Sequence, residues 1–326
     1  VKAGPDVEVK SKRLGGANYQ VPVPVNAERK VTLLYRWILK CARKRKGSTM
    51  TVNLARELMD LIANRGSVVK EMENLRKMVS AYKKQKNNFP EWMKNIEILP
   101  IWDDHDYGLN DAGSEYPLKR QSQEIYLNFW GIPLDDDRHN RDGIYFSEEK
   151  IIQGKVFKLI FLDTRFFRSK LKGPKGKYIE NLDPDATILG NSQWNWLENE
   201  LKDQFDFLMI FSSIQIIAED HPYEKWNNFP HEKEKLFNML KKHNDKTLFV
   251  SGDRHRGGIY KESGIYEITA SSLNKPGSNF DETDANLIGK TYNQENYGSL
   301  EVSETKIKVL LKDVNGKTLN MVSLKY

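Results

Sequence analysis

The sequence predicts an α+β chain in which a small helical module with a β-hairpin precedes a larger module of strands and helices. Residues 1–84 combine a hairpin pattern with three amphipathic helical runs. From about residue 96, short apolar runs end repeatedly in polar clusters. Residues 1–84 also hold 19 Lys and Arg against 7 Asp and Glu, a net charge of +12, so the remainder carries −6 of the overall +6. This split indicates two modules, of which the basic one suits a polyanion.

The length and composition of the chain exclude several classes of protein. A chain of 326 residues can bury the cores of two domains. It has no apolar run of about 18 residues, so no membrane span or membrane partner is expected. Residues 1–13 lack the apolar centre of a signal peptide, which favours a cytoplasmic location. The single cysteine, Cys41, excludes an intramolecular disulfide and is expected to be a small core residue.

The basic module should begin with a hairpin over residues 6–25, because β-forming residues alternate on both sides of the turn signal Gly15-Gly16. Helices are expected over residues 28–45, 51–64 and 67–84. Cations on the hairpin and the first helix would meet RNA phosphates, although a solvated basic face is the alternative. These cations are Lys10, Lys12, Arg13, Arg36, Lys40, Arg43, Lys44 and Arg45.

The run VEVKSKRLGGANYQVPV at residues 7–23 closely resembles the hairpin of the S-seven family of small-subunit ribosomal proteins. Arg36-Trp37, ARKR at residues 42–45 and LAREL at residues 54–58 resemble that family's helices in the same order. The resemblance covers residues 1–80 and implies contact with ribosomal RNA of the subunit head, with the hairpin near the exit-site tRNA. The family's leading helices have no counterpart here, and its usual ending is not recognisable after about Met78.

The second module should contain two helices after residue 120 and a further one near residue 233, with strands between and after them. The expected helices cover residues 121–130, a stretch starting at Ser192, and residues 233–243. The expected strands cover residues 96–101, 143–146, 156–162, 205–211, 247–250, 266–271, 299–309 and 321–324.

Two polar clusters follow apolar runs and suggest a metal site. In the first, four carboxylates and one imidazole fall within residues 103–111. In the second, Asp253 and His255 follow the run at residues 247–250. Carboxylate oxygens and a neutral imidazole suit a divalent metal, which can activate water at neutral pH. A solvated acidic turn is the alternative.

The ordered motifs at residues 102–113, 162–165, 212–215 and 251–255 resemble the PhoD-like branch of the metallophosphatases. The stretches at residues 189–194 and 224–226 fit the same branch, and the resemblance spans residues 82–326. It implies a two-sheet sandwich flanked by helices, with a metal centre where loops of both sheets meet. It also implies hydrolysis of phosphate esters with divalent or trivalent metal ions, for which Ca, Fe, Mn and Zn are candidates.

The resemblance assigns roles position by position. Asp104, Asp253 and His255 match metal-ligand positions. His105 could stabilise phosphoryl charge or protonate the leaving oxygen. Arg165 could bind phosphate bidentately, and a structural Asp–Arg pair is equally open. Asp163 and His221 are candidates for the substrate pocket, whereas His139, His231 and His243 lie outside the motifs and are expected at the surface.

The family's early Asp-x-His and Gly-Asp motifs are missing, and residues 1–81 contain no histidine. We therefore expect an incomplete metallophosphatase sandwich with open edges, exposed apolar surface and a widened pocket between Asp104 and His255. The chain is interpreted as a chimera of residues 1–80 and 82–326. A true fusion, a deletion product and a sequence-assembly error are all open origins. The predicted function is a metal-dependent phosphoric ester hydrolase fused to an RNA-binding segment. The alternative is a non-catalytic rRNA-binding protein with a passenger domain.

Overall fold

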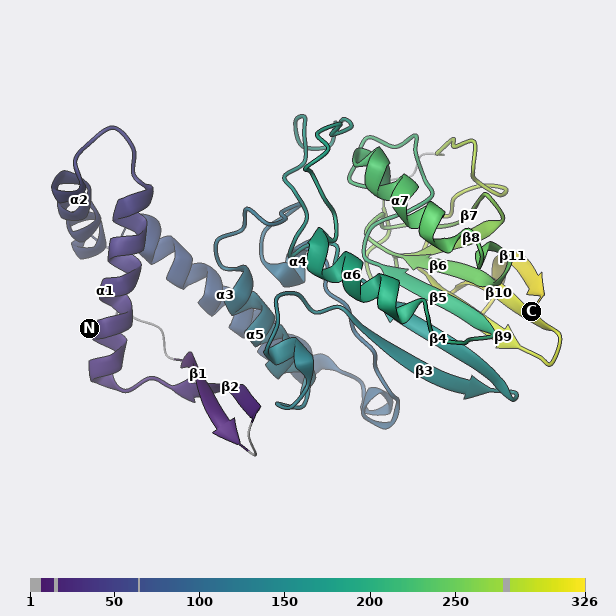
Figure 1. Cartoon of the computed structure of the whole chain (residues 1–326), viewed down its shortest axis with the longest axis horizontal. Coiled ribbons are helices and arrows are strands. Elements are labelled where there is room, and N and C mark those ends of the chain that lie inside the picture. The colour runs from purple at the N-terminus through teal and green to yellow at the C-terminus, as the bar shows by residue number, and fades with distance from the viewer. Residues whose placement is uncertain (1–6, 15–16, 64, 278–281, 326) are drawn as a thin grey trace. The chain divides into compact units, whose positions relative to one another are not determined.

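The computed structural model describes residues 7–14, 17–63, 65–277 and 282–325, and the chain divides into two compact units (Figure 1). Unit 1 contains residues 1–100 and 118–142, and unit 2 contains residues 101–117 and 143–326. Among the described residues, no helix is both long and apolar enough to cross a membrane.

Unit 1 begins with the expected hairpin. Strands β1 (Val7–Leu14) and β2 (Ala17–Pro24) pair antiparallel, with Leu14 opposite Ala17. The predicted turn at Gly15-Gly16 and the outer end at Asp6 lie outside the described residues. On β1, Lys10 lies opposite Val21 of β2 in the ladder.

The three predicted helices are confirmed as α1 (Ala27–Lys44), α2 (Met50–Ile62) and α3 (Ser67–Asn88). Side-chain caps fix the first two helix starts: Asn26 accepts from the Arg29 amide at 2.9 Å, and Thr49 accepts from the Val52 amide at 3.5 Å. The helices pack around Ile38, Cys41 and Val68, all nearly inaccessible, so Cys41 is the predicted core residue.

Helix α3 continues four residues past its expected end and so passes through the predicted junction of the two modules. Its last part packs against α5 (Lys119–Trp130), the predicted helix at residues 121–130. The rings of Tyr82 and Phe129 lie 4.5 Å apart, and those of Phe89 and Trp130 lie 6.0 Å apart. Two short 3-10 helices, η1 (Glu91–Asn95) and η2 (Asp137–His139), complete this unit.

The expectation that His139 lies at the surface is wrong. Its side chain is 0% exposed. In the interior, Nδ1 lies 3.6 Å from a Glu124 carboxylate oxygen and Nε2 lies 3.2 Å from the Ile132 carbonyl oxygen. A polar ring can be buried in this way when both nitrogens face polar groups.

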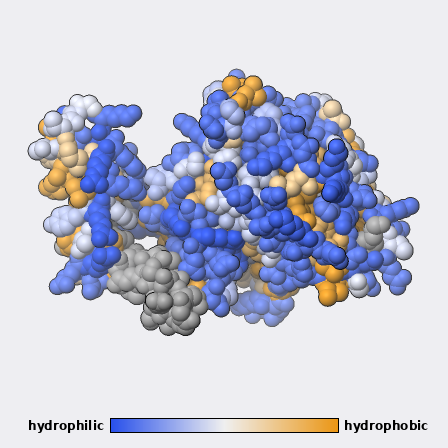
Figure 2. All heavy atoms as spheres, viewed as in Figure 1, coloured by the Kyte–Doolittle hydropathy of each residue, from blue (hydrophilic) through white to orange (hydrophobic). Residues whose placement is uncertain are grey.

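Apolar side chains lie exposed on unit 1, as expected for a fragment of a larger fold. Figure 2 shows them gathered over α2. Met59 is 67% exposed and Ile62 is 86% exposed, with Val52 and Leu58 also outside the core. A helix of a globular protein normally buries such residues against a neighbour.

Unit 2 contains two sheets. In the larger sheet, with strand order β3-β4-β5-β6-β8-β7, the four inner strands are parallel and both edge strands are antiparallel. Its strands are β3 (Phe146–Ile152), β4 (Lys155–Phe161), β5 (Phe207–Ser212), β6 (Thr247–Ser251), β7 (Gly257–Glu262) and β8 (Ile265–Ala270). The smaller antiparallel sheet contains β9 (Asn296–Val302), β10 (Lys306–Asp313) and β11 (Thr318–Lys325).

The predicted sandwich flanked by helices is confirmed. One face of the larger sheet packs against the smaller sheet, where Phe207 and Leu248 share a core with Val309 and Leu311. The opposite face is covered by α6 (Gly190–Glu200) and α7 (Pro230–Leu240), whose buried residues include Trp194, Leu197, Leu236 and Leu240. Alternate residues of each inner strand therefore face one apolar layer or the other.

Three strand predictions need correction, and one strand was not predicted. The strand expected at residues 143–146 instead covers Phe146–Ile152, as β3. Residues 96–101 form no strand, because a strand requires a hydrogen-bonded neighbour and none of the described strands pairs with them. Residues 299–309 form parts of β9 and β10, separated by a turn at residues 303–305. Strand β7 was not predicted, since two glycines begin it directly after a polar motif.

Candidate active site

The acidic stretch forms a short helix, α4 (Asp104–Tyr107), inside a compact loop of unit 2. A capping box between Asp103 and Asp106 closes its first turn. Burial raises the pKa of Asp106 to about 6. Asp104 is 6% exposed, and one of its oxygens accepts the backbone N–H of Asp111 at 3.0 Å. The loop thereby turns two carboxylates of the motif towards each other.

The carboxylate of Asp163 ties this loop to the sheet. It follows β4, is fully buried, and accepts from the indole of Trp102 at 3.0 Å and from the Ile144 amide at 2.9 Å. It also accepts the backbone N–H groups of Arg165 and Phe166, each at 2.9 Å. Its predicted contact with substrate stays a prediction, because all of these partners belong to the scaffold.

Arg165 lies between two carboxylates and is fully buried. Its Nη1 and Nη2 donate to Glu224 at 2.8 and 2.5 Å, and its Nε donates to Asp103 at 2.8 Å. These carboxylates raise the pKa of Arg165, against the lowering effect of burial. The geometry supports the structural ion pair, one of the two roles considered for this residue.

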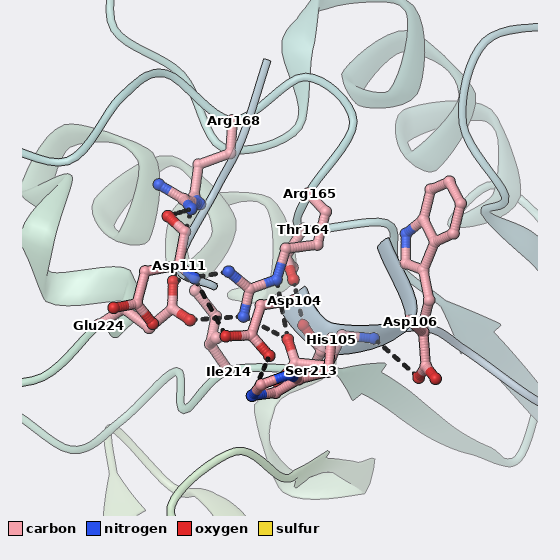
Figure 3. A network of polar contacts seen from close by, with 12 residues as sticks. Asp104, His105, Asp106, Asp111, Thr164, Arg165, Arg168, Ser213, Ile214 and Glu224 are labelled. Carbon is pink, nitrogen blue, oxygen red and sulfur yellow. Dashed lines mark hydrogen bonds and ion pairs between the residues drawn. The ribbon is translucent and has the colours of Figure 1, made fainter. Parts of the chain in front are cut away.

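Glu224 and Asp111 were not singled out as site residues from the sequence, although both stand in the recognised motifs. Arg168 lies 3.4 Å from Glu224 and donates to the Asp111 carbonyl at 2.7 Å. Carboxylate oxygens of Asp104, Asp111 and Glu224 all lie within 4.8 Å of one another. Figure 3 shows Arg165 and Arg168 pointing into this acidic cluster.

The second predicted pair of ligands lies on the loop after β6. Asp253 and His255 both have left-handed backbone, with φ of 68° and 52°. Residues other than glycine tolerate this conformation only where the surroundings hold it, and such positions cluster at functional sites. Burial, then Asp103 and Glu224, raise the pKa of Asp253 well above its usual range. The contribution of Asp103 and Glu224 to this shift indicates an electrostatic interaction between the two loops.

The imidazoles of the site differ in exposure. Burial, with Lys275 and His105 nearby, lowers the pKa of His255, so its ring is neutral and offers a lone pair. The His105 side chain is 84% exposed, with Nε2 lying 4.0 Å from Asp104. His221 is buried in unit 2, and its Nδ1 accepts the Tyr223 amide at 3.3 Å. Burial and the cations Arg254 and Lys225 lower its pKa well below the usual range.

The donor set fits a metal ion. Asp104, Asp111 and Glu224 bring carboxylate oxygens together, and carboxylate oxygens suit hard cations. The predicted ligands Asp253 and His255 would add an oxygen and a neutral nitrogen. A bound cation would also offset the burial and the neighbouring carboxylates that raise the pKa of Asp253. At Glu224 the two guanidinium groups already supply positive charge. The acidic cluster could therefore bind a metal at the side formed by Asp104.

The predicted RNA-binding residues of α1 fall into two groups. Arg36 and Arg43 are exposed, Lys40 is half-buried, and none of these three has an acidic partner within 4 Å among the described residues. By contrast, Arg45 pairs with Glu57 at 2.7 Å and Asp60 at 2.5 Å. Lys44 lies 3.6 Å from Glu71. Lys10, Lys12 and Arg13 lie on β1, where only the backbone is described.

The larger part of the chain is a helix-flanked sandwich with a carboxylate-rich site on its loops. The family model described as PhoD-like phosphatase matches residues 46–309, so the chain belongs to the PhoD-like phosphatase family. A solved structure titled "Structure of PhoD" is similar, with a TM-score of 0.53 and 16% identity. It aligns over 69% of this chain and 51% of that one, and at this identity it supports the fold alone.

The first quarter of the chain matches a second family. The model described as Ribosomal protein S7p/S5e covers residues 1–83. Small ribosomal subunit protein uS7 of Hydrogenovibrio crunogenus is 54% identical over 80 residues, 24% of this chain and 51% of that protein. That of Gluconobacter oxydans is 52% identical over 79 residues, 24% of this chain and 50% of that protein. The chain thus spans about half the length of the curated relatives it matches, and the predicted chimera is confirmed.

Proposed function

We propose that residues 82–326 hydrolyse phosphate esters with a divalent or trivalent metal ion, and that residues 1–80 bind ribosomal RNA. The observation that carries the hydrolase proposal is the acidic cluster, in which carboxylate oxygens of Asp104, Asp111 and Glu224 lie within 4.8 Å of one another. Asp253 and His255, about 150 positions further along the chain than Asp104, interact electrostatically with it. Family membership over residues 46–309 supports the same reaction class.

Each site residue takes a role from its surroundings. Asp104, Asp253 and His255 would hold the metal, which supplies Lewis acidity and lowers the pKa of bound water. His105, exposed beside Asp104, can donate a proton to the leaving oxygen. Arg165 keeps the Asp103 and Glu224 loops together and so positions the acidic cluster. Asp163 fixes the acidic loop through Trp102, and His221 lines a neighbouring cavity.

Hydrolysis of a chromogenic phosphate monoester, with and without added Mn²⁺, Zn²⁺, Ca²⁺ or Fe³⁺, tests the hydrolase proposal. Activity should require a metal and vanish on chelation, and Asp104→Ala and His255→Ala should each abolish it. Asp245→Ala, which removes an exposed carboxylate from the short 3-10 helix η4 (Asn244–Lys246), is the matched control. Hydrolysis that persists in chelator would refute the metal-dependent mechanism.

The second candidate function is RNA binding without catalysis. It is favoured by Arg36, Lys40 and Arg43, which share one face of α1 and have no acidic partners among the described residues. Each phosphate contact releases counterions, so affinity for small-subunit rRNA should fall steeply with salt. Fluorescence anisotropy between low and high salt measures this slope. An affinity that does not change with salt would exclude phosphate contacts by these side chains.

A further inference from the structure

A cavity of about 500 Å³ lies in unit 2 beside the acidic cluster. Its lining includes Tyr178, Glu180, Lys225 and Asn227. The Tyr178 hydroxyl donates to the Asp111 carboxylate at 2.7 Å, which joins the cavity wall to the candidate active site. The volume lies within the ~300–1,000 Å³ common for small-molecule sites. A group bonded to a phosphate at the acidic cluster could therefore occupy this space.

The lining suits a flat ring with polar edges. Tyr178 provides an aromatic side chain, while Asn227 provides amide donors and an acceptor and Glu180 provides carboxylate acceptors. The Asn227 amide lies 3.5 Å from Glu180 in an exposed contact, so a ligand can displace this weak bond. Proteins recognise unpaired nucleobases by stacking on aromatic side chains and by hydrogen bonds to the base edges.

A second observation concerns the basic face of α1. Arg36, Lys40 and Arg43 stand at i, i+4 and i+7, and so form a stripe about 10 Å long. Regularly spaced cations of this kind track a single nucleic-acid strand through its phosphates. Because the stripe and the cavity belong to one chain, a strand bound at the stripe stays tethered to the unit that carries the cavity.

We propose that the phosphate ester hydrolysed by this protein is the terminal phosphate of single-stranded RNA, whose last nucleoside occupies the cavity lined by Tyr178, Glu180 and Asn227. This inference rests on the proposed hydrolase function. In the reaction, a water oxygen bonds to phosphorus and the phosphorus–ester oxygen bond breaks. The ribose oxygen takes up a proton, leaving an RNA hydroxyl and inorganic phosphate.

The first experiment compares kcat/KM of the full chain for three substrates: a 12-residue single-stranded RNA with a terminal phosphate, ribitol phosphate and a chromogenic monoester. We expect RNA to exceed ribitol phosphate at least tenfold. The ratio of RNA to chromogenic ester should fall at least fivefold in Asn227→Ala and in Arg36→Ala/Arg43→Ala. It should be unchanged in Asn238→Ala and in Lys241→Ala/Lys317→Ala, which remove exposed amide and cationic groups elsewhere.

Equal rates for RNA and ribitol phosphate would overturn the inference while leaving the hydrolase function intact. Hydrolysis of none of the three would instead contradict the hydrolase function. Binding of unphosphorylated adenosine, measured by saturation-transfer NMR, tests the cavity without any reaction. Adenosine should bind, ribitol should not, and Asn227→Ala should weaken adenosine binding at least fivefold. Failure of adenosine to bind would overturn the assignment of the cavity whatever the enzyme assays give.

Discussion

Arg165 and Glu224, 59 positions apart, form a buried bidentate ion pair whose contacts measure 2.8 and 2.5 Å. The two side chains are 0% and 1% exposed. The pair joins the loop after β4 to the loop before η3 (Trp226–Asn228), and Asp103 on the acidic loop completes it. A buried ion pair is costly to break, because the remaining charge has no solvent around it.

Replacement of Glu224 by Gln should lower the free energy of unfolding of unit 2 by about 3–5 kcal/mol, because Arg165 stays charged and buried with one carboxylate lost. Urea unfolding followed by tryptophan fluorescence measures the loss. Glu301→Gln is the control, since its contact with Lys308 at 3.4 Å is half-exposed. That variant should lose less than about 1 kcal/mol. Similar losses in both variants would contradict the structural role of the pair.

Metal binding should stabilise the chain against heat. At a concentration near 100 times Kd, a ligand that binds only the folded state adds about 2.7 kcal/mol. The gain should disappear in Asp253→Asn, because asparagine tolerates the φ of 68° at this position but carries no charge. Differential scanning fluorimetry with and without Mn²⁺ measures the shift, and Asp245→Asn is the control. A full metal-induced shift in Asp253→Asn would exclude this residue as a ligand.

Unit 1 should lose stability as pH rises. Glu124 raises the pKa of His139 above its ordinary value of 6.5. The resulting stabilisation is fully present below the unfolded pKa and is lost as pH rises through the raised folded pKa. Unfolding measured at several values from about pH 6 to pH 9 should show this loss. Glu124→Gln should flatten the dependence, and an unaltered slope in that variant would refute the assignment.

Unit 2 should lose stability as pH falls. The pKa of buried His221 is depressed well below 6.5. Stability is therefore complete above the unfolded pKa and falls as pH falls from that value towards the folded pKa. His221→Gln removes the titrating group and should make unfolding near pH 5 resemble unfolding near pH 7 more closely. If the variant and the parent lose stability equally on acidification, His221 is not the responsible group.

The chain should be marginally stable or prone to associate. Burial of apolar surface contributes roughly 25 cal/mol per Å², so a few hundred exposed Å² matches much of a domain's net stability. Met59→Lys/Ile62→Glu should reduce association in sedimentation experiments, because both side chains are largely exposed. Leu182→Ser, which removes a 71% exposed side chain from unit 2, is the control. A monomer with one cooperative transition above about 60 °C would contradict this prediction.

Local patterns were sufficient for most elements. The helical period identified α1, α2 and α3, and runs such as residues 156–162 and 247–250 identified central strands. Local patterns gave wrong predictions where hydrogen bonding between strands decides whether a segment is a strand. Residues 96–101 have the composition of a strand but no described strand beside them, and β7 begins at two glycines that offered no apolar signal.

The site was predicted only as far as its motifs extend. Asp104, Asp253 and His255 came from short runs of known type, whereas the acidic cluster also includes Glu224, which lies 120 positions after Asp104. The bond from Tyr178 to Asp111 joins residues 67 positions apart, and no local pattern indicates it. The sequence also did not identify Asp103 and Glu224 as the partners of Arg165. An arginine in a buried ion pair and an arginine that binds phosphate have the same sequence signature.

Helix α3 has a consequence for proteolysis. Residues 46–83 are matched by both family models, and the helix that runs through this overlap reaches Asn88 without a break. Proteases need an extended, accessible backbone, which an intact helix denies them. Tyr82 is also buried against Phe129. The part of α3 where the two family matches overlap should therefore be among the segments most resistant to proteolytic cleavage. Limited proteolysis should therefore cleave the loops first and release no fragment that begins near residue 82.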